Sequence, residues 1–91
     1  MTMMKLDEIL SIINSRGWSR QPTPWDENLY IFWNVDWIYP MWGVDCKRWT
    51  FTEKDGEVEK IDVTIYDSKW GGFETTFKEI KNIHDIMIYI D

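Results

Sequence analysis

The sequence predicts one α+β domain over residues 1–91, with an N-terminal helix, a four-stranded antiparallel meander and a short C-terminal helix, in the order α-β-β-β-β-α. Three observations lead to this prediction. Apolar residues repeat with a helical period near the start, they alternate between turn signals through the middle, and a capped apolar segment closes the chain. A chain of 91 residues has room for one hydrophobic core.

The first helix is expected over residues 3–16. Its apolar side chains have the i, i+3, i+4, i+7 spacing that lines one face of a helix, at Leu6, Ile9, Leu10 and Ile13. Gly17 is the expected stop, because glycine readily adopts the left-handed conformation that ends helices.

Residues 18–28 are expected to form an irregular connector, since Pro22 and Pro24 prevent regular strand pairing. Two tryptophans are expected to pin this connector to the body of the domain, Trp18 and Trp25. The alternating residues 29–35 predict the first strand. Both of its faces carry aromatic side chains, which indicates a central strand or a strand whose outer face binds a partner.

A hairpin is expected next, with strands over 46–53 and 57–67. A two-residue Asp-Gly turn would place Trp49 opposite Asp62, whereas a three-residue loop ending at Gly56 would place Trp49 opposite Ile61. The three-residue loop is favoured, because it gathers the large apolar side chains on one face: Trp49, Phe51, Ile61, Val63 and Ile65.

The last part of the chain predicts a turn at Trp70-Gly-Gly72 and a fourth strand over 73–79. Residues 83–90 fit either a helix or a strand, because their isoleucines satisfy both periods. A short helix is favoured, since Asn82 is a good N-cap with Asp85 three residues further on.

The composition argues against several functions. The chain carries a net charge of −6 and its bases are scattered, so direct binding to nucleic acid is not expected. One cysteine excludes an internal disulfide, which fits a cytoplasmic protein. The start does not resemble a signal peptide, and the longest apolar run, 86–90, is too short to span a membrane.

Catalysis, metal binding and cofactors are not expected either. One histidine and one cysteine make no standard zinc set, and the carboxylates form no calcium-binding ladder. We expect Cys46 to be a buried thiol and His84 to be solvated in the last helix. Paired carboxylates acting as acid and base stay as a third, less favoured hypothesis.

One stretch is not explained by a small core alone. Between Arg20 and Lys47, 26 residues contain no Lys or Arg. They hold seven aromatic residues (Trp25, Tyr30, Phe32, Trp33, Trp37, Tyr39 and Trp42) and four acids (Asp26, Glu27, Asp36 and Asp45). Trp and Tyr are enriched where proteins grip one another, and the loop 36–45 is hard to bury as a whole.

The leading hypothesis is therefore a small, acidic, protein-binding module that acts as a stoichiometric inhibitor of the anti-defence, immunity or antitoxin type. Its target would be a larger protein with a basic, nucleic-acid-handling surface. The expected anchor residues are Trp37, Tyr39, Met41 and Trp42, with an acidic rim of Asp26, Glu27, Asp36 and Asp45. The alternatives are a small-ligand module that uses these rings as a stacking platform or cation cage, a homodimer through the same face, and a loop that is only a lid on the core.

Overall fold

The computed structural model describes residues 3–37, 40–41 and 43–91. In chain order these residues form β1 (Met4–Lys5), α1 (Leu6–Ser15), β2 (Ser19–Gln21), β3 (Leu29–Trp33), β4 (Cys46–Lys54), β5 (Glu57–Val58), β6 (Ile61–Lys69), β7 (Gly72–Ile80) and α2 (Ile83–Tyr89). The α+β class with an antiparallel sheet is thus confirmed. The predicted number of strands is wrong, since seven are present in this part of the chain.

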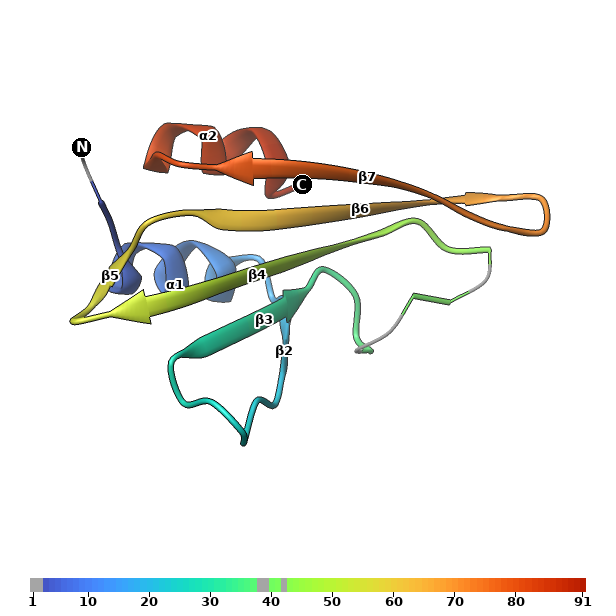
Figure 1. Ribbon diagram of the computed structural model, residues 1–91. Coiled ribbons are helices and arrows are strands. Elements are labelled where there is room, and N and C mark those ends of the chain that lie inside the picture. Colours follow the sequence, from blue (N-terminus) through green and yellow to red (C-terminus); the bar gives the residue numbers. More distant parts are fainter. Residues whose placement is uncertain (1–2, 38–39, 42) are drawn as a thin grey trace.

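The main row of the sheet runs β2-β3-β4-β6-β7, and every neighbouring pair is antiparallel (Figure 1). The predicted four-stranded meander corresponds to β3, β4, β6 and β7. The three additional strands are short: β1 and β5 pair at one end of β4, and β2 pairs with β3. β2 lies inside the predicted connector and stops before Pro22, because proline cannot continue the ladder.

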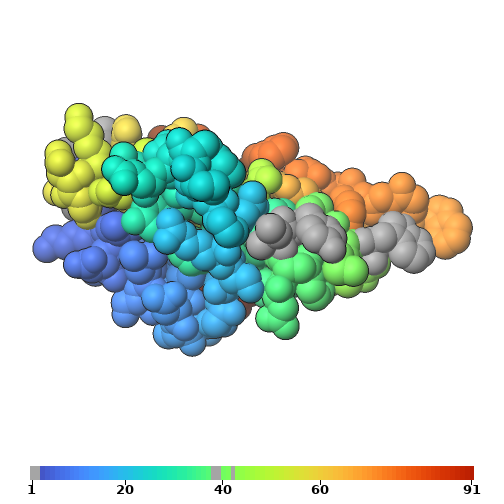
Figure 2. Space-filling model, turned by 90° about the horizontal axis from the view of Figure 1, so that it is seen from below, coloured from blue at the N-terminus to red at the C-terminus, as the bar shows by residue number. Residues whose placement is uncertain are grey.

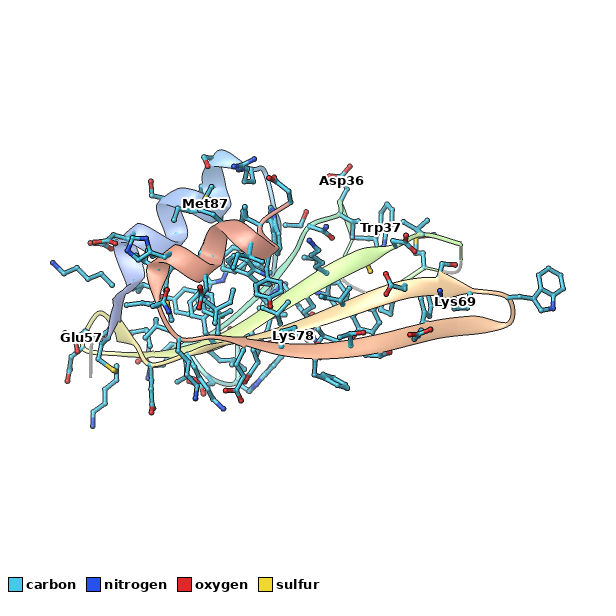
Figure 3. All side chains as sticks on the ribbon, turned by 90° about the horizontal axis from the view of Figure 1, so that it is seen from above. Asp36, Trp37, Glu57, Lys69, Lys78 and Met87 are labelled. Atoms are coloured by element: carbon cyan, nitrogen blue, oxygen red, sulfur yellow. The ribbon has the colours of Figure 1, made fainter. Side chains whose placement is uncertain are left out.

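Both helices lie on one face of the sheet (Figures 1 and 3). Their apolar stripes pack onto the side chains that the central strands turn toward them. The buried core contains Met4, Ile9, Ile13, Trp18, Phe32, Trp49, Phe51, Val58, Ile61, Val63, Ile80, Ile86 and Ile90. Among the described residues, neither helix combines the length and the apolar character that crossing a membrane requires. No helix of the described residues covers the opposite face of the sheet.

The helix boundaries follow from local chemistry. α1 begins at Leu6, later than the predicted residue 3, because Met4 and Lys5 pair with β5 instead. It ends before Gly17, whose φ of 70° is the expected left-handed stop. The last segment is a helix, as favoured, and the Asn82 side chain accepts a hydrogen bond from the Asp85 backbone N–H at 3.1 Å.

The register of the central hairpin differs from both predicted alternatives. A two-residue turn at Asp55-Gly56, with φ of 54° and 79°, pairs Lys54 with Glu57. Further along, Thr50 pairs with Asp62 and Trp49 with Val63, so one strand carries an extra residue, a β-bulge within 59–61. The three-residue loop was therefore wrong. The predicted shared face is confirmed, because the bulge restores the side-chain parity that the short turn would have reversed.

The two tryptophans of the connector differ in burial. Trp18 is buried, and its ring lies 4.8 Å from that of Trp49, so it pins the arm as predicted. Trp25 is 67% exposed, and the prediction that it also pins the arm is wrong. Each face of β3 carries a buried aromatic residue, Phe32 toward the helices and Trp33 on the opposite side, as suits a strand between β2 and β4.

We predict that Trp49→Ala lowers the free energy of unfolding by about 3–5 kcal/mol, because it empties a fully buried indole site at the centre of the core. Trp70→Ala is the matched control, since it removes the same side chain from a solvent-exposed turn and should change stability by less than about 0.5 kcal/mol. Urea denaturation followed by circular dichroism measures both. Equal losses in the two variants would contradict the assignment of the core.

Candidate functional site

The β6–β7 hairpin projects beyond the rest of the molecule (Figure 1). Its two nine-residue strands pair continuously from Ile61 and Ile80 at the base to Lys69 and Gly72 at the tip. The loop that joins β3 to β4 lies at the same end of the molecule. We call the described residues of loop 34–45 together with residues 66–74 the hairpin end.

Trp70 occupies the tip of this hairpin. Trp70 and Gly71 form the two-residue turn, Gly71 has a φ of 87°, and the Trp70 side chain is 96% exposed. A side chain at the tip of a projecting two-residue turn has no neighbouring element to cover it. The sequence pattern predicted only a turn here, and Trp70 was not among the predicted site residues. The available signal was a large aromatic directly before two glycines.

Aromatic side chains brace the hairpin on the face without helices. The Trp33 ring stacks on Tyr66 at 5.8 Å, and Tyr66 meets Phe73 edge-on at 6.0 Å. The Trp33 indole N–H donates to Gln21 at 3.0 Å, and the Arg48 guanidinium lies 5.6 Å from the Trp33 ring centre. These contacts join the projecting strands to the body of the sheet, so the tip is carried on a braced arm rather than on a loose loop.

The loop is tied to the strands by side-chain caps. The Lys47 backbone N–H donates to the Asn34 side-chain oxygen at 2.8 Å, and the Ser68 backbone N–H donates to Asp45 Oδ1 at 2.7 Å. The second bond spans from the end of the loop to β6, close to the tip. Loop and hairpin therefore form one continuous surface.

The predicted anchor residues are placed unevenly. Trp37 is half-buried and its indole nitrogen is enclosed without an acceptor among the described residues, whereas Met41 is 41% exposed. In Figure 3, Asp36 and Trp37 lie between the helices and the hairpin tip, and Lys69 of β6 lies nearer the tip. Tyr39 and Trp42 lie outside the described residues. Trp37 is thus partly a packing residue, and Met41 and Trp70 are the exposed apolar groups.

The predicted acidic rim is divided between two places. Asp36 and Asp45 are exposed at the hairpin end, where the half-buried Asp67 of β6 joins them. Asp26 and Glu27 lie in the β2–β3 loop, at the other end of β3, where Asp26 Oδ1 accepts from the Asn28 N–H at 2.9 Å. Figure 2 shows the hairpin tip (orange) tapering away from this loop (cyan). Of the acids named here, only Asp36, Asp45 and Asp67 can belong to one surface with Trp70.

The hollow beside the loop is small and polar. It has a volume of about 240 Å³ and is lined by Asn34, Asp45, Cys46, Lys47, Ile65, Tyr66 and Asp67. It contains a single aromatic ring, whereas a cation cage needs several. Among the described residues no group of three or more His, Cys, Asp or Glu side chains is arranged to hold a metal ion. Comparisons with protein-family models, curated proteins and solved structures found no match.

Cys46 is buried in β4, as predicted, and His84 is exposed in the first turn of α2. Burial raises the pKa of the Cys46 thiol above its usual value, and the neighbouring Asp45 carboxylate raises it further. A raised pKa keeps the thiol protonated and weakly nucleophilic. Cys46 is therefore suited to packing beside the loop.

We predict a pH-dependent contribution of Cys46 to stability. The folded state holds the thiol proton more tightly than the unfolded state, so this contribution is complete below the ordinary thiol pKa of about 8.5 and declines as the pH rises above it. Urea denaturation between pH 7 and 10 of wild type and Cys46→Ala, which removes the titrating group, measures the difference. The free energy of unfolding of wild type should fall relative to that of Cys46→Ala as the pH rises above 9. If it stays constant or increases relative to the variant, the raised pKa is contradicted.

Proposed function

We propose that this protein is a protein-binding module, of the stoichiometric inhibitor type, that grips a larger protein through the hairpin end. The observation that carries the proposal is the exposure of Trp70, 96% of whose side chain faces solvent at the tip of a braced hairpin. Leaving an indole in water forgoes about 1.5–3 kcal/mol of burial, which a binding pocket on a partner would supply.

The geometry suits an anchor residue. Trp is among the residues most enriched at binding hot spots, where one buried ring can contribute 2 kcal/mol or more. The Trp33–Tyr66–Phe73 contacts hold the arm in place before binding, so little conformational freedom is lost on association. Met41 adds a second exposed apolar group, whose flexible side chain adapts to a partner surface.

The acids at the hairpin end indicate the kind of partner. Asp36 and Asp45 lie in the same loop as Met41, Asp67 precedes Trp70 by three residues along the hairpin, and Lys69 is paired with Glu74 at 3.9 Å. A negative rim steers association toward a positive surface. The proposed target is therefore a larger protein with a basic, nucleic-acid-handling surface in the cytoplasm, and the module itself needs no catalytic group to block it.

Replacing the anchor should abolish most of the binding. We expect Trp70→Ala to weaken binding of the partner at least about 30-fold, equivalent to about 2 kcal/mol. Tagged wild type and variant are first used for co-purification from a lysate of the native host, and the retained partner is then titrated by biolayer interferometry.

Trp25→Ala is the matched control, because Trp25 is also exposed but lies in the β2–β3 loop away from the hairpin end. This variant should bind within about twofold of wild type. Equal weakening by the two variants, or a partner retained equally by all three proteins, would refute the hairpin end as the binding surface.

Neutralising the rim should act mainly on the association rate. The triple variant Asp36→Asn/Asp45→Asn/Asp67→Asn is expected to slow association several-fold at low salt and to flatten its dependence on ionic strength, while dissociation changes little. Asp26→Asn/Glu27→Gln, at the other end of β3, serves as control and should leave the rates within about twofold. Stopped-flow mixing at 20 and 300 mM salt measures them, and a triple variant with unchanged salt dependence would exclude a basic target surface.

A further inference from the structure

β7 is a long edge strand whose outer side is open. It pairs with β6 over all nine of its residues, and in the part of the chain that the structure describes no strand pairs with its other side. Figure 3 looks onto the β7 side of the sheet and shows both helices to one side of β7. An open edge of this length is a template for another strand.

The turn at the hairpin tip determines which residues of β7 direct their backbone N–H and C=O groups toward the open edge. A two-residue turn is closed by a hydrogen-bonded pair, here Lys69 and Gly72, so the even-numbered residues of β7 direct their backbone groups toward β6. The odd-numbered residues, from Phe73 to Glu79, therefore turn their N–H and C=O groups outward. Two copies pairing antiparallel through these groups could form about eight main-chain hydrogen bonds.

The charges of β7 select one register for such self-pairing. When two copies pair symmetrically about Thr76, Glu74 of each lies opposite Lys78 of the other, giving two ion pairs. Sliding the strands by two residues leaves both charged groups opposite uncharged ones. Sliding them by four places Glu74 opposite Glu74 or Lys78 opposite Lys78, which is repulsive.

The side chains involved are available for this arrangement. Lys78 is exposed, and within the described residues it has no carboxylate in ion-pair distance, while Glu74 is held only by Lys69 at 3.9 Å. Phe77 is 72% exposed on the face without helices, and the same register sets it opposite Thr75 of the second copy. Pairing in this register would therefore cover part of the exposed Phe77 ring and give the Lys78 ammonium a carboxylate partner.

We propose that two copies of this chain associate by antiparallel pairing of their β7 edges about Thr76, forming one continuous sheet. This goes beyond the proposed binding function. The two hairpin tips lie past the paired stretch and point to opposite ends of the dimer, so Trp70 is outside the strand-to-strand contact and its loss tests a different contact.

Reversing the charges at Glu74 and Lys78, singly and together, tests the proposal, and the result does not depend on any one variant being folded. Sedimentation equilibrium should give wild type twice the mass of one chain. Glu74→Lys and Lys78→Glu each convert both ion pairs into like-charge pairs, and each should weaken the dimer at least about tenfold. The double variant Glu74→Lys/Lys78→Glu restores opposite charges and should recover the dimer, as should an equimolar mixture of the two single variants.

A disulfide at the two-fold axis tests the register. Thr76→Cys should crosslink two copies rapidly under mild oxidation, because position 76 faces itself, whereas Thr75→Cys, which faces Phe77, should crosslink slowly. A monomeric wild type at high micromolar concentration would overturn the proposal. It would also be overturned by a dimer that ignores charge reversal, or one that crosslinks faster through position 75.

Discussion

Trp49 is a fully buried indole at the centre of the strand to which three other strands pair, and both layers of the protein are arranged around it. Its cross-strand neighbours are Phe32 of β3 and Val63 of β6, and the Trp18 ring closes over it at 4.8 Å. A side chain this large and apolar must be covered from the helix side of the sheet. That requirement decides which face of β4 is covered, and pairing then decides the faces of every strand in the row.

The bulge after the Asp55-Gly56 turn determines which side chains of β6 and β7 face the helices, as far as the hairpin end. Without the extra residue, the turn would direct Ile61 and Val63 away from the helices, while with it they join Trp49 in the core. The same parity sends the alternate residues of β6 and β7 to the other face, among them Tyr66 and Phe73. The aromatic contacts that brace the projecting arm therefore follow from how the core is filled.

The domain combines a buried apolar core with exposed apolar side chains at the hairpin end. Its core sits at one end, where the helices cover the sheet. At the other end, the exposed Trp70 and Met41 lie on elements held by the Asp45–Ser68 bond and by stacked rings. A net charge of −6 favours the solubility of a domain that carries such a surface. Because the exposed indole lies on a turn outside the core, the proposed contact with a partner would leave the core packing unchanged.

The sequence by itself determined the elements whose signals are local: the periodic first helix, the Asn82-capped last helix, the alternating strands and the face shared by Trp49, Phe51, Ile61 and Val63. It also located the acidic, aromatic stretch, although Asp26 and Glu27 were grouped with residues that lie at the other end of β3. Only the tertiary structure decided the short added strands, the bulge, and which tryptophans are covered. Trp18, Trp25 and Trp70 look alike in sequence, yet their exposure depends on neighbours distant along the chain. Burial of a side chain is a property of what packs over it, and no local pattern contains that information.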